Sequence, residues 1–122
     1  MLPQIIPKFP DNIHKFVDLF GGGFNVGINV NAREIIYNDI GAQVVELLNY
    51  LSKNKSGILI KDIEKIINLY NLSKTNQEGY LNLRMDYNTN PDPIKFYTLI
   101  CYSFNNQIRF NSKGEYNMPF GK

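Results

Sequence analysis

The stretch Lys15-Phe-Val-Asp-Leu-Phe-Gly-Gly-Gly23 decides the fold, because an apolar, β-prone run ends abruptly in three consecutive glycines. The chain then resumes as Val26-Gly-Ile-Asn-Val30, a second short apolar run. A third run, Glu34-Ile-Ile-Tyr-Asn-Asp39, ends in a carboxylate. Strands that alternate with glycine turns in this way are typical of the start of an α/β unit. We therefore predict a first strand at 15–20 that resumes at 26–30 after a glycine turn, and a second strand that ends at Asp39.

The spacing of two acids around this turn predicts a cofactor. Asp39 follows Asp18 by 21 residues, close to the roughly 20-residue spacing at which an acid accepts the ribose hydroxyls of a nucleotide. Asp18 can meet an ammonium group while the turn amides face a carboxylate, which suits the zwitterionic end of S-adenosylmethionine. A glycine turn without any ligand remains an alternative.

A nicotinamide cofactor is disfavoured by the glycine spacing. The dinucleotide fingerprint G-x-G-x-x-G is absent from the segment, and only the looser G-x-G-x-x-x-G fits, at Gly21, Gly23 and Gly27. The glycines of such a turn let a cofactor approach the backbone closely. The pattern leaves nicotinamide chemistry as a weaker alternative.

Composition narrows the class of protein. The 122 residues suffice for one ordinary domain, and 13 basic against 11 acidic residues give a net charge of +2. The single Cys101 excludes an intrachain disulfide framework and a multi-cysteine metal site. No apolar stretch approaches the roughly 18 residues of a membrane span, and the N-terminus lacks a signal-peptide pattern. We expect a cytoplasmic protein with no membrane partner and no metal site.

The middle of the chain has helical periodicity. Apolar residues recur at helical spacing from Gly41 to Leu51, and a second amphipathic helix has Ile60, Ile63, Ile67 and Tyr70 on its buried face. Thr75-Asn-Gln-Glu78 has the pattern of a capping box. The helix that this box opens is expected to bury three further residues, namely Tyr80, Leu83 and Tyr87.

A last helix follows Asp92-Pro93, a natural N-cap and first helical residue. The segment Ile94–Phe104 is apolar on most sides, so we predict a buried helix with Cys101 in the core. His14 has no second histidine with which to form a metal pair, and we expect it at the surface.

The C-terminal stretch predicts a polar hairpin. Residues 107–110 alternate polar and apolar, 111–114 have turn chemistry, and 115–118 can return as a second strand. Asn and Gln can pair with adenine, Arg with guanine, and Lys with phosphate, and a two-stranded ribbon is narrow enough for a major groove. Taken alone, the segment still favours an ordinary solvated hairpin.

Three segments together resemble the DNA adenine methylase family. They are Phe16-Val-Asp-Leu-Phe-Gly-Gly-Gly, Asn38-Asp-Ile40, and Tyr102-Ser-Phe-Asn-Asn-Gln-Ile-Arg-Phe-Asn-Ser-Lys-Gly114. These enzymes transfer a methyl group from S-adenosylmethionine to the exocyclic nitrogen of adenine, typically in GATC sites. The resemblance implies an α/β fold, with a partial Rossmann-like methyltransferase sheet in residues 1–56 and a helical target-recognition region with a β-hairpin in 57–122.

The resemblance also assigns roles to individual residues. Asp39 would hold the ribose of S-adenosylmethionine. The rest of the cofactor pocket would include Asp18, Phe20, Gly21 and Gly22. The residues expected to face double-stranded DNA are Asn105, Asn106, Arg109, Asn111 and Lys113.

The chain departs from the family pattern at three places. It begins with Leu2-Pro-Gln-Ile5, after the family's Gly-Gly-Lys, and Phe24 stands where a second glycine often falls. The family's catalytic Asp-Pro-Pro-Tyr is absent, so no catalytic residue is assigned. We expect an N-terminal fragment that is inactive alone, truncated or split from a complementary C-terminal chain. A non-catalytic DNA-binding module is the alternative.

Overall fold

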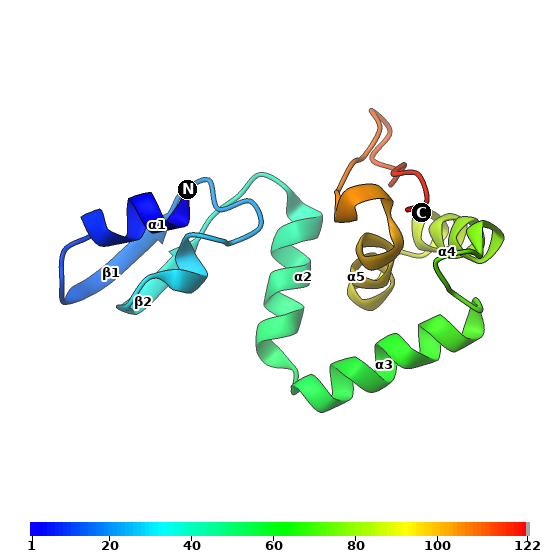
Figure 1. Ribbon diagram of the computed structural model, residues 1–122, viewed down its shortest axis with the longest axis horizontal. Helices are drawn as coiled ribbons and strands as arrows, with labels where there is room; N and C mark the ends of the chain where they lie inside the picture. The colour runs from blue at the N-terminus through cyan, green and yellow to red at the C-terminus, as the bar shows by residue number, and fades with distance from the viewer. Residues whose placement is uncertain (122) are drawn as a thin grey trace. The chain divides into compact units, whose positions relative to one another are not determined.

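The computed structural model describes residues 1–121, and these form two compact units, Met1–Glu46 and the described residues from Leu47 onward. Figure 1 shows the elements of each unit. Helix α2 (Ala42–Lys53) begins in the first unit and continues into the second. The fold is mixed α/β, as predicted, and its named sheet has two strands within the described residues.

A pair of parallel strands forms the centre of the first unit. Strand β1 (Ile13–Asp18) pairs with β2 (Ala32–Tyr37) in the register Ile13↔Ala32 to Asp18↔Tyr37, so the two strands end side by side. A short helix α1 (Leu2–Ile5) and a 3₁₀ turn η1 (Ile6–Lys8) precede them. Parallel strands need a crossover of about a dozen residues, which residues 19–31 supply.

The predicted strand at 26–30 is wrong. The segment contains a 3₁₀ turn, η2 (Gly27–Asn29), whose end is closed by the Val30 amide on the Gly27 carbonyl. The Gly27 amide donates to the Asp18 carboxylate at 3.0 Å instead of joining a strand ladder. The Asp18 side chain at the end of β1 therefore binds the backbone of the segment that the apolar pattern assigns to a strand.

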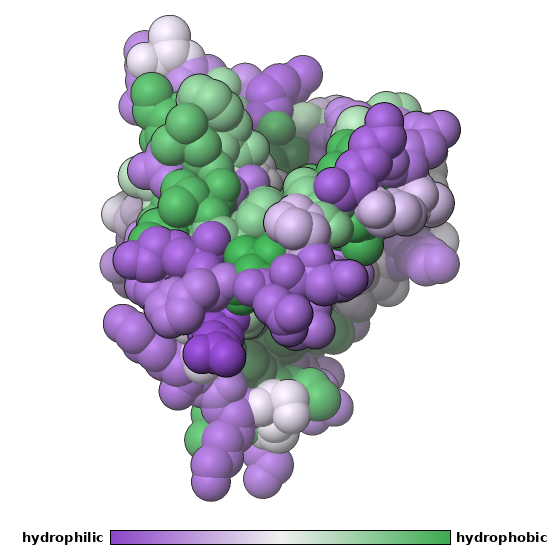
Figure 2. All heavy atoms as spheres, turned by 90° about the vertical axis from the view of Figure 1, so that its left-hand side faces the viewer, coloured by the Kyte–Doolittle hydropathy of each residue, from purple (hydrophilic) through white to green (hydrophobic). Residues whose placement is uncertain are grey.

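The first unit has little core of its own. Val30 is its one buried large hydrophobic residue within the described chain, and Phe9 packs edge-on against Phe16 at 5.3 Å between ring centroids. Several large hydrophobic side chains are exposed, including Val17, Leu19, Phe20, Ile28, Ile36 and Ile40. On the face shown in Figure 2, apolar surface lies between hydrophilic side chains.

The second unit consists of helices and a C-terminal hairpin. Helices α3 (Ser56–Leu69), α4 (Gln77–Thr89) and α5 (Pro93–Tyr102) are followed by a 3₁₀ turn, η3 (Phe104–Asn106). Helix α5 packs against both α3 and α4. The core of the second unit combines helix residues with residues of the hairpin. The most deeply buried side chains of this unit are Tyr80, Leu83, Phe96, Thr98, Leu99 and Tyr116.

Aromatic rings join the hairpin to the helices. Tyr87 of α4 stacks on Phe96 of α5 at 5.6 Å between centroids, and Tyr116 meets both rings edge-on. Phe110 lies 5.7 Å from Phe96 and 5.6 Å from Tyr116. Edge-to-face pairs at these distances are favourable beyond the area that they bury. One face of the predicted ribbon is therefore part of the core.

The helix starts are only partly as predicted. Asp92 caps α5, since its Oδ1 accepts from the Ile94 and Lys95 amides at 2.9 and 3.1 Å. The prediction of a capping box at Thr75 is wrong. Asn76 is the N-cap of α4, and its Oδ1 accepts from the Gly79 amide at 3.0 Å. Asn76 has non-helical backbone angles, φ −96° and ψ 81°, as an N-cap requires, so the helix starts one position later than the pattern indicates.

Two buried faces also differ from the prediction. In α3 the buried residue is Leu59, while Ile60 is 55% exposed. Neighbouring side chains of a helix point about 100° apart, so Leu59 and Ile60 lie on different faces. Helix α5 ends at Tyr102, and Cys101 is exposed instead of buried in the core. The side-chain amide of Asn106 caps this end of the helix, since its Nδ2 donates to the carbonyls of Ile100 and Cys101.

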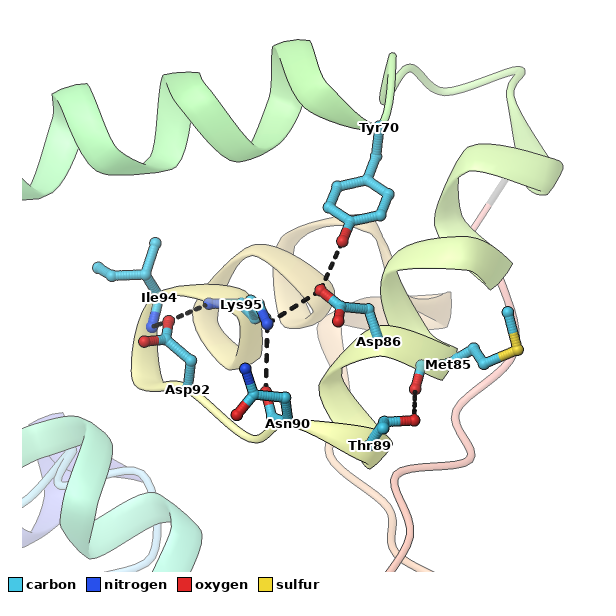
Figure 3. A network of polar contacts seen from close by, with 8 residues as sticks. All are labelled: Tyr70, Met85, Asp86, Thr89, Asn90, Asp92, Ile94 and Lys95. Carbon is cyan, nitrogen blue, oxygen red and sulfur yellow. Dashed lines mark hydrogen bonds and ion pairs between the residues drawn. The ribbon is translucent and has the colours of Figure 1, made fainter.

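A network of polar contacts joins the three helices that precede the hairpin (Figure 3). Lys95 of α5 lies 2.9 Å from the Asp86 carboxylate of α4, and the Tyr70 hydroxyl, at the end of α3, donates to the same carboxylate. These two partners hold the pKa of Asp86 below its usual range. The hydrogen bond to Asp86, followed by burial, raises the pKa of Tyr70 to about 12.

Across residues 1–121, none of the helices has the length and apolar character needed to cross a membrane. The same residues contain no group of three or more His, Cys, Asp or Glu side chains that could hold a metal ion. His14 is exposed at the second position of β1, as predicted.

Candidate functional site: the carboxyl ends of the parallel strands and the C-terminal hairpin

The carboxyl ends of β1 and β2 bring the two predicted acids into one loop cluster. Asp18 is the last residue of β1, and Asp39 lies two residues past the end of β2. Asp39 accepts the Gly22 amide at 2.9 Å through Oδ2 and the Gly41 amide at 2.8 Å through Oδ1. Two of the predicted cofactor residues, Gly22 and Asp39, are thus bonded directly to each other. In open α/β sheets, ligands bind at the carboxyl ends of the strands.

The glycine turn folds back over β2. The Gly21 amide donates to the Asn38 carbonyl at 3.0 Å, and the Tyr37 hydroxyl donates to the Gly22 carbonyl at 2.7 Å. Asn38 in turn donates from its side chain to the Leu19 carbonyl at 2.8 Å. The turn is therefore held by three consecutive residues at the end of β2, namely Tyr37, Asn38 and Asp39.

Two of the glycines are required for different reasons. Gly22 has φ +50°, a left-handed conformation that an L side chain rarely adopts, and the space beside its Cα is open. Gly21 has no room for a Cβ, because the Tyr37 ring occupies that position. The close approach at Gly21 is thus made by a tyrosine of the same chain, whereas the sequence argument assigns it to a cofactor.

Electrostatics at this end of the sheet are negative. The Gly41 and Gly22 hydrogen bonds stabilise the ionised form of Asp39 and hold the pKa of that carboxyl below its usual range. Burial raises the pKa of Tyr37, and the carboxylates of Asp39 and Asp18 raise it further. Phe20 presents an apolar ring that is 87% exposed. The cluster therefore offers two carboxylates and an open aromatic surface.

Sequence reasoning missed the part that Tyr37 and Asn38 play in this cluster. Both immediately precede Asp39, at the end of the strand that the sequence predicts. Their position at the carboxyl end of a parallel strand is the signal that could have found them.

The chain turns back at residues 111–114 as predicted, but the two predicted strands do not form, and the segments on either side of the turn are paired by the isolated β-bridge Phe110↔Tyr116. Asn111 organises the turn, since its Oδ1 accepts the amides of Lys113 and Glu115, each at 2.9 Å. Its side-chain amide also donates to the Glu115 carboxylate at 2.7 Å. Asn111 is half-buried and supports the turn that carries Lys113.

The other predicted DNA-facing residues are exposed. Arg109 donates to the side-chain and backbone oxygens of Asn117, each at 2.8 Å, which leaves the guanidinium at the surface in a fixed orientation. Asn106 caps α5, as described above. The side chains of Asn105 and Lys113 make no hydrogen bond within residues 1–121, and Asn105 has φ +52°.

Comparison with known proteins decides the family. The whole chain, residues 1–122, matches the family described as D12 class N6 adenine-specific DNA methyltransferase. The chain belongs to this family. The resemblance to adenine methylases that the sequence predicts is therefore confirmed.

The relatives are DNA-modifying enzymes of bacteria. The chain is 55% identical to the type II methyltransferase M.FokI of Planomicrobium okeanokoites and 46% identical to the modification methylase StsI of Streptococcus sanguinis, each over 122 residues. It is 29% identical to a DNA adenine methylase of Haemophilus influenzae over 97% of the chain. The chain spans 19% of the length of the first two relatives and 42% of the third.

Proposed function

We propose that this member of the D12 class forms the N-terminal part of an adenine-specific DNA methyltransferase. Residues 1–56 would contribute to a Rossmann-like sheet and to the S-adenosylmethionine site, and residues 57–122 would recognise duplex DNA. The single observation that carries the proposal is the direct bond between Asp39 and the Gly22 amide at the carboxyl ends of two parallel strands.

The donor and acceptor set at this end of the sheet fits S-adenosylmethionine. The Asp39 oxygens each accept one amide and keep lone pairs for the ribose hydroxyls. Asp18 supplies negative charge for the ammonium group, and the exposed Phe20 ring offers an apolar surface for the adenine. When bound, S-adenosylmethionine would supply an electrophilic methyl group for adenine N6.

The residues of this chain would bind and orient the two reactants. The adenine must leave the base stack before its amino nitrogen can be reached, and that nitrogen becomes a good nucleophile only when acceptors localise its lone pair. The family's Asp-Pro-Pro-Tyr supplies such acceptors, and the 122 residues do not contain it. We therefore propose that these residues bind but do not transfer the methyl group alone.

Site-resolved NMR tests the cofactor site. Adding S-adenosylmethionine to the ¹⁵N-labelled chain is expected to shift the amide signals of Gly21, Gly22 and Gly41. Asp39→Asn is expected to abolish the shifts. Asp11→Asn is the matched control, because the Asp11 side chain is exposed and makes no hydrogen bond within residues 1–121.

The same titration separates the cofactor classes. Shifts with NAD⁺ but not with S-adenosylmethionine would assign the site to nicotinamide chemistry. If neither compound shifts the amide signals of these glycines, the proposed cofactor site is wrong.

DNA binding is tested by fluorescence anisotropy with a labelled duplex. Arg109→Ala and Lys113→Ala are each expected to weaken binding, and Lys113→Ala is expected to lower the salt slope by about one. Duplexes with a GATC site and with a scrambled site test the GATC-type specificity that the resemblance implies. Equal binding to both would show that the site sequence is different.

The proposed inactivity is tested with labelled S-adenosylmethionine and duplex DNA. The chain alone is expected to leave the DNA unlabelled, and a C-terminal chain that contains Asp-Pro-Pro-Tyr is expected to restore transfer. Methylation above background by the 122 residues alone would overturn this part of the proposal.

One observation favours a second candidate, a non-catalytic DNA-binding module. Nearly all buried hydrophobic residues of the described chain lie in the second unit, which also carries the hairpin. Such a module would bind DNA with the same affinity whether or not S-adenosylmethionine is present. Anisotropy titrations with and without the compound distinguish the two candidates.

A further inference from the structure

We infer that Asn88 of α4 is a positioning residue that fixes the orientation of Arg109 on the hairpin for DNA binding. The inference rests on the proposed function for the role of Arg109 in DNA binding. The orientation itself rests on contacts that do not involve DNA.

Asn88 binds the hairpin as a neighbouring strand would. Its side-chain Nδ2 donates to the Tyr116 carbonyl at 3.0 Å, and its Oδ1 accepts the Tyr116 amide at 2.8 Å. One primary amide thus satisfies both backbone groups of one residue, as a paired strand does in a ladder. The returning segment of the hairpin therefore has a fixed partner on α4.

The bond to Asn88 is transmitted to Arg109 through one peptide plane. The carbonyl of Tyr116 and the amide of Asn117 belong to the same planar peptide unit. The carbonyl accepts from Asn88, and the amide donates to the Arg109 carbonyl at 3.0 Å. Fixing the first bond therefore fixes the direction of the second.

Asn117 then orients the charged group of Arg109. Its side-chain oxygen accepts from Arg109 Nε, and its carbonyl accepts from Nη2, each at 2.8 Å. The guanidinium is exposed, and the two bonds leave its other N–H groups free for an acceptor outside the chain. A residue 21 positions earlier in the chain thereby controls the direction of an exposed cation.

Two further residues on the same face of α4 bind the returning segment of the hairpin, two residues beyond Tyr116. Tyr80 and Arg84 both donate to the Met118 carbonyl, at 2.9 and 3.0 Å. Tyr80, Arg84 and Asn88 are spaced four residues apart, so they share one helix face. Asn88 differs from the other two because its bonds reach the peptide unit that contacts Arg109.

Hydrogen exchange at Arg109 tests the positioning role without DNA. In Asn88→Ala, the Arg109 Nε–H is expected to exchange about tenfold faster than in the unmodified chain. Asn82→Ala is the matched control, because Asn82 lies on the same helix, is exposed, and makes no hydrogen bond within residues 1–121. Unchanged exchange in a folded Asn88→Ala variant would overturn the inference.

A double-mutant cycle tests the role in DNA binding. Asn88→Ala and Arg109→Ala are each expected to raise the Kd for duplex DNA about tenfold, and the double variant is expected to lose no more than Arg109→Ala alone. Additive losses would overturn the inference. No loss in Arg109→Ala, with exchange at Arg109 still dependent on Asn88, would overturn the proposed DNA contact and with it the role of Asn88 in binding.

A second variant, Asn88→Asp, keeps the inference testable if Asn88→Ala does not fold. Asn88→Asp has the same size and still accepts the Tyr116 amide, but as a carboxylate it cannot donate to the Tyr116 carbonyl. Its Arg109 Nε–H is expected to exchange faster, with an unchanged far-ultraviolet circular dichroism spectrum. Unchanged exchange in this variant would also overturn the inference.

Discussion

Asp39 is a carboxylate whose charge is stabilised by backbone amides. Gly41 and Gly22 donate to its two oxygens, and these bonds favour the ionised form over the protonated form. No side-chain cation is needed to lower its pKa. The residue can therefore remain ionised while its remaining lone pairs face a ligand.

At the residue scale, we predict that the native pKa of Asp39 lies below the ordinary value of 3.8. Because the native pKa is depressed, its contribution to stability is fully present above the unfolded value and is lost as the pH falls through the native value. A carboxyl NMR titration measures the pKa directly. Asp39→Asn should remove this part of the pH dependence of unfolding, whereas Asp11→Asn should retain it.

The Tyr70–Asp86 pair gives a second residue-scale prediction. Tyr70→Phe is expected to lower the free energy of unfolding at pH 7 by about 1 kcal/mol, because one hydrogen bond is lost while Lys95 still balances Asp86. The pKa of Tyr70 is raised to about 12, so its contribution is fully present below pH 10 and is lost as the pH rises toward 12.

Urea unfolding of Tyr70→Phe and the unmodified chain at pH 7 and at high pH measures this loss. Tyr50→Phe is the control, because the Tyr50 hydroxyl makes no hydrogen bond within residues 1–121. A difference between Tyr70→Phe and the unmodified chain that persists unchanged at pH 12 would contradict the prediction.

At the element scale, the start of α4 shows why a sequence pattern can locate a helix and still misplace its cap. Thr75 and Glu78 have the right types and spacing for a capping box. However, Asn76 receives the Gly79 amide and also donates to the Asn71 carbonyl at 2.7 Å, which ties the cap to the preceding turn. That second bond comes from the turn at the end of α3, which a local pattern does not contain.

Substitution at these two positions distinguishes the alternatives. Asn76→Ala is expected to lower the free energy of unfolding by about 1 kcal/mol, the usual effect of losing an N-cap. Thr75→Ala is expected to change it by less than about 0.5 kcal/mol, as for an exposed position. Equilibrium urea unfolding measures both, and a larger loss in Thr75→Ala would restore the capping box.

At the scale of the whole molecule, burial is distributed unevenly between the two units. The first unit buries one large hydrophobic residue within the described chain, Val30, whereas the second contains the core of α4, α5 and the hairpin. Regions with few buried apolar contacts open at lower free energy than a packed core. The proposed cofactor loops therefore belong to the less stable unit.

We predict that hydrogen exchange will be faster in the first unit. Amides of β1 and β2 should exchange more rapidly than those of α4 and α5 when followed by mass spectrometry. Leu83→Ala, which removes a fully buried side chain, should accelerate exchange throughout the second unit, because such truncations cost about 2–5 kcal/mol. Equal protection in the two units would contradict the prediction.

The local pattern by itself determined the strand that precedes the glycines at 21–23, the four main helices after Gly41, the cap at Asp92 and the turn at Asn111–Gly114. These features depend on residues within a few positions of one another, so periodicity and turn chemistry are sufficient to find them. The similarity of the three quoted segments to adenine methylases likewise indicated the family from sequence alone.

Only the tertiary structure decided how those elements hold their functional groups. The bonds from Asn88 to Tyr116 span 28 residues, and the bond from Asp39 to Gly22 spans 17. The same holds for the 3₁₀ turn at Gly27–Asn29, where the Asp18 carboxylate takes a backbone amide nine residues away. Hydrogen bonds between residues distant in the sequence form only when the chain has packed, so local sequence patterns cannot predict them.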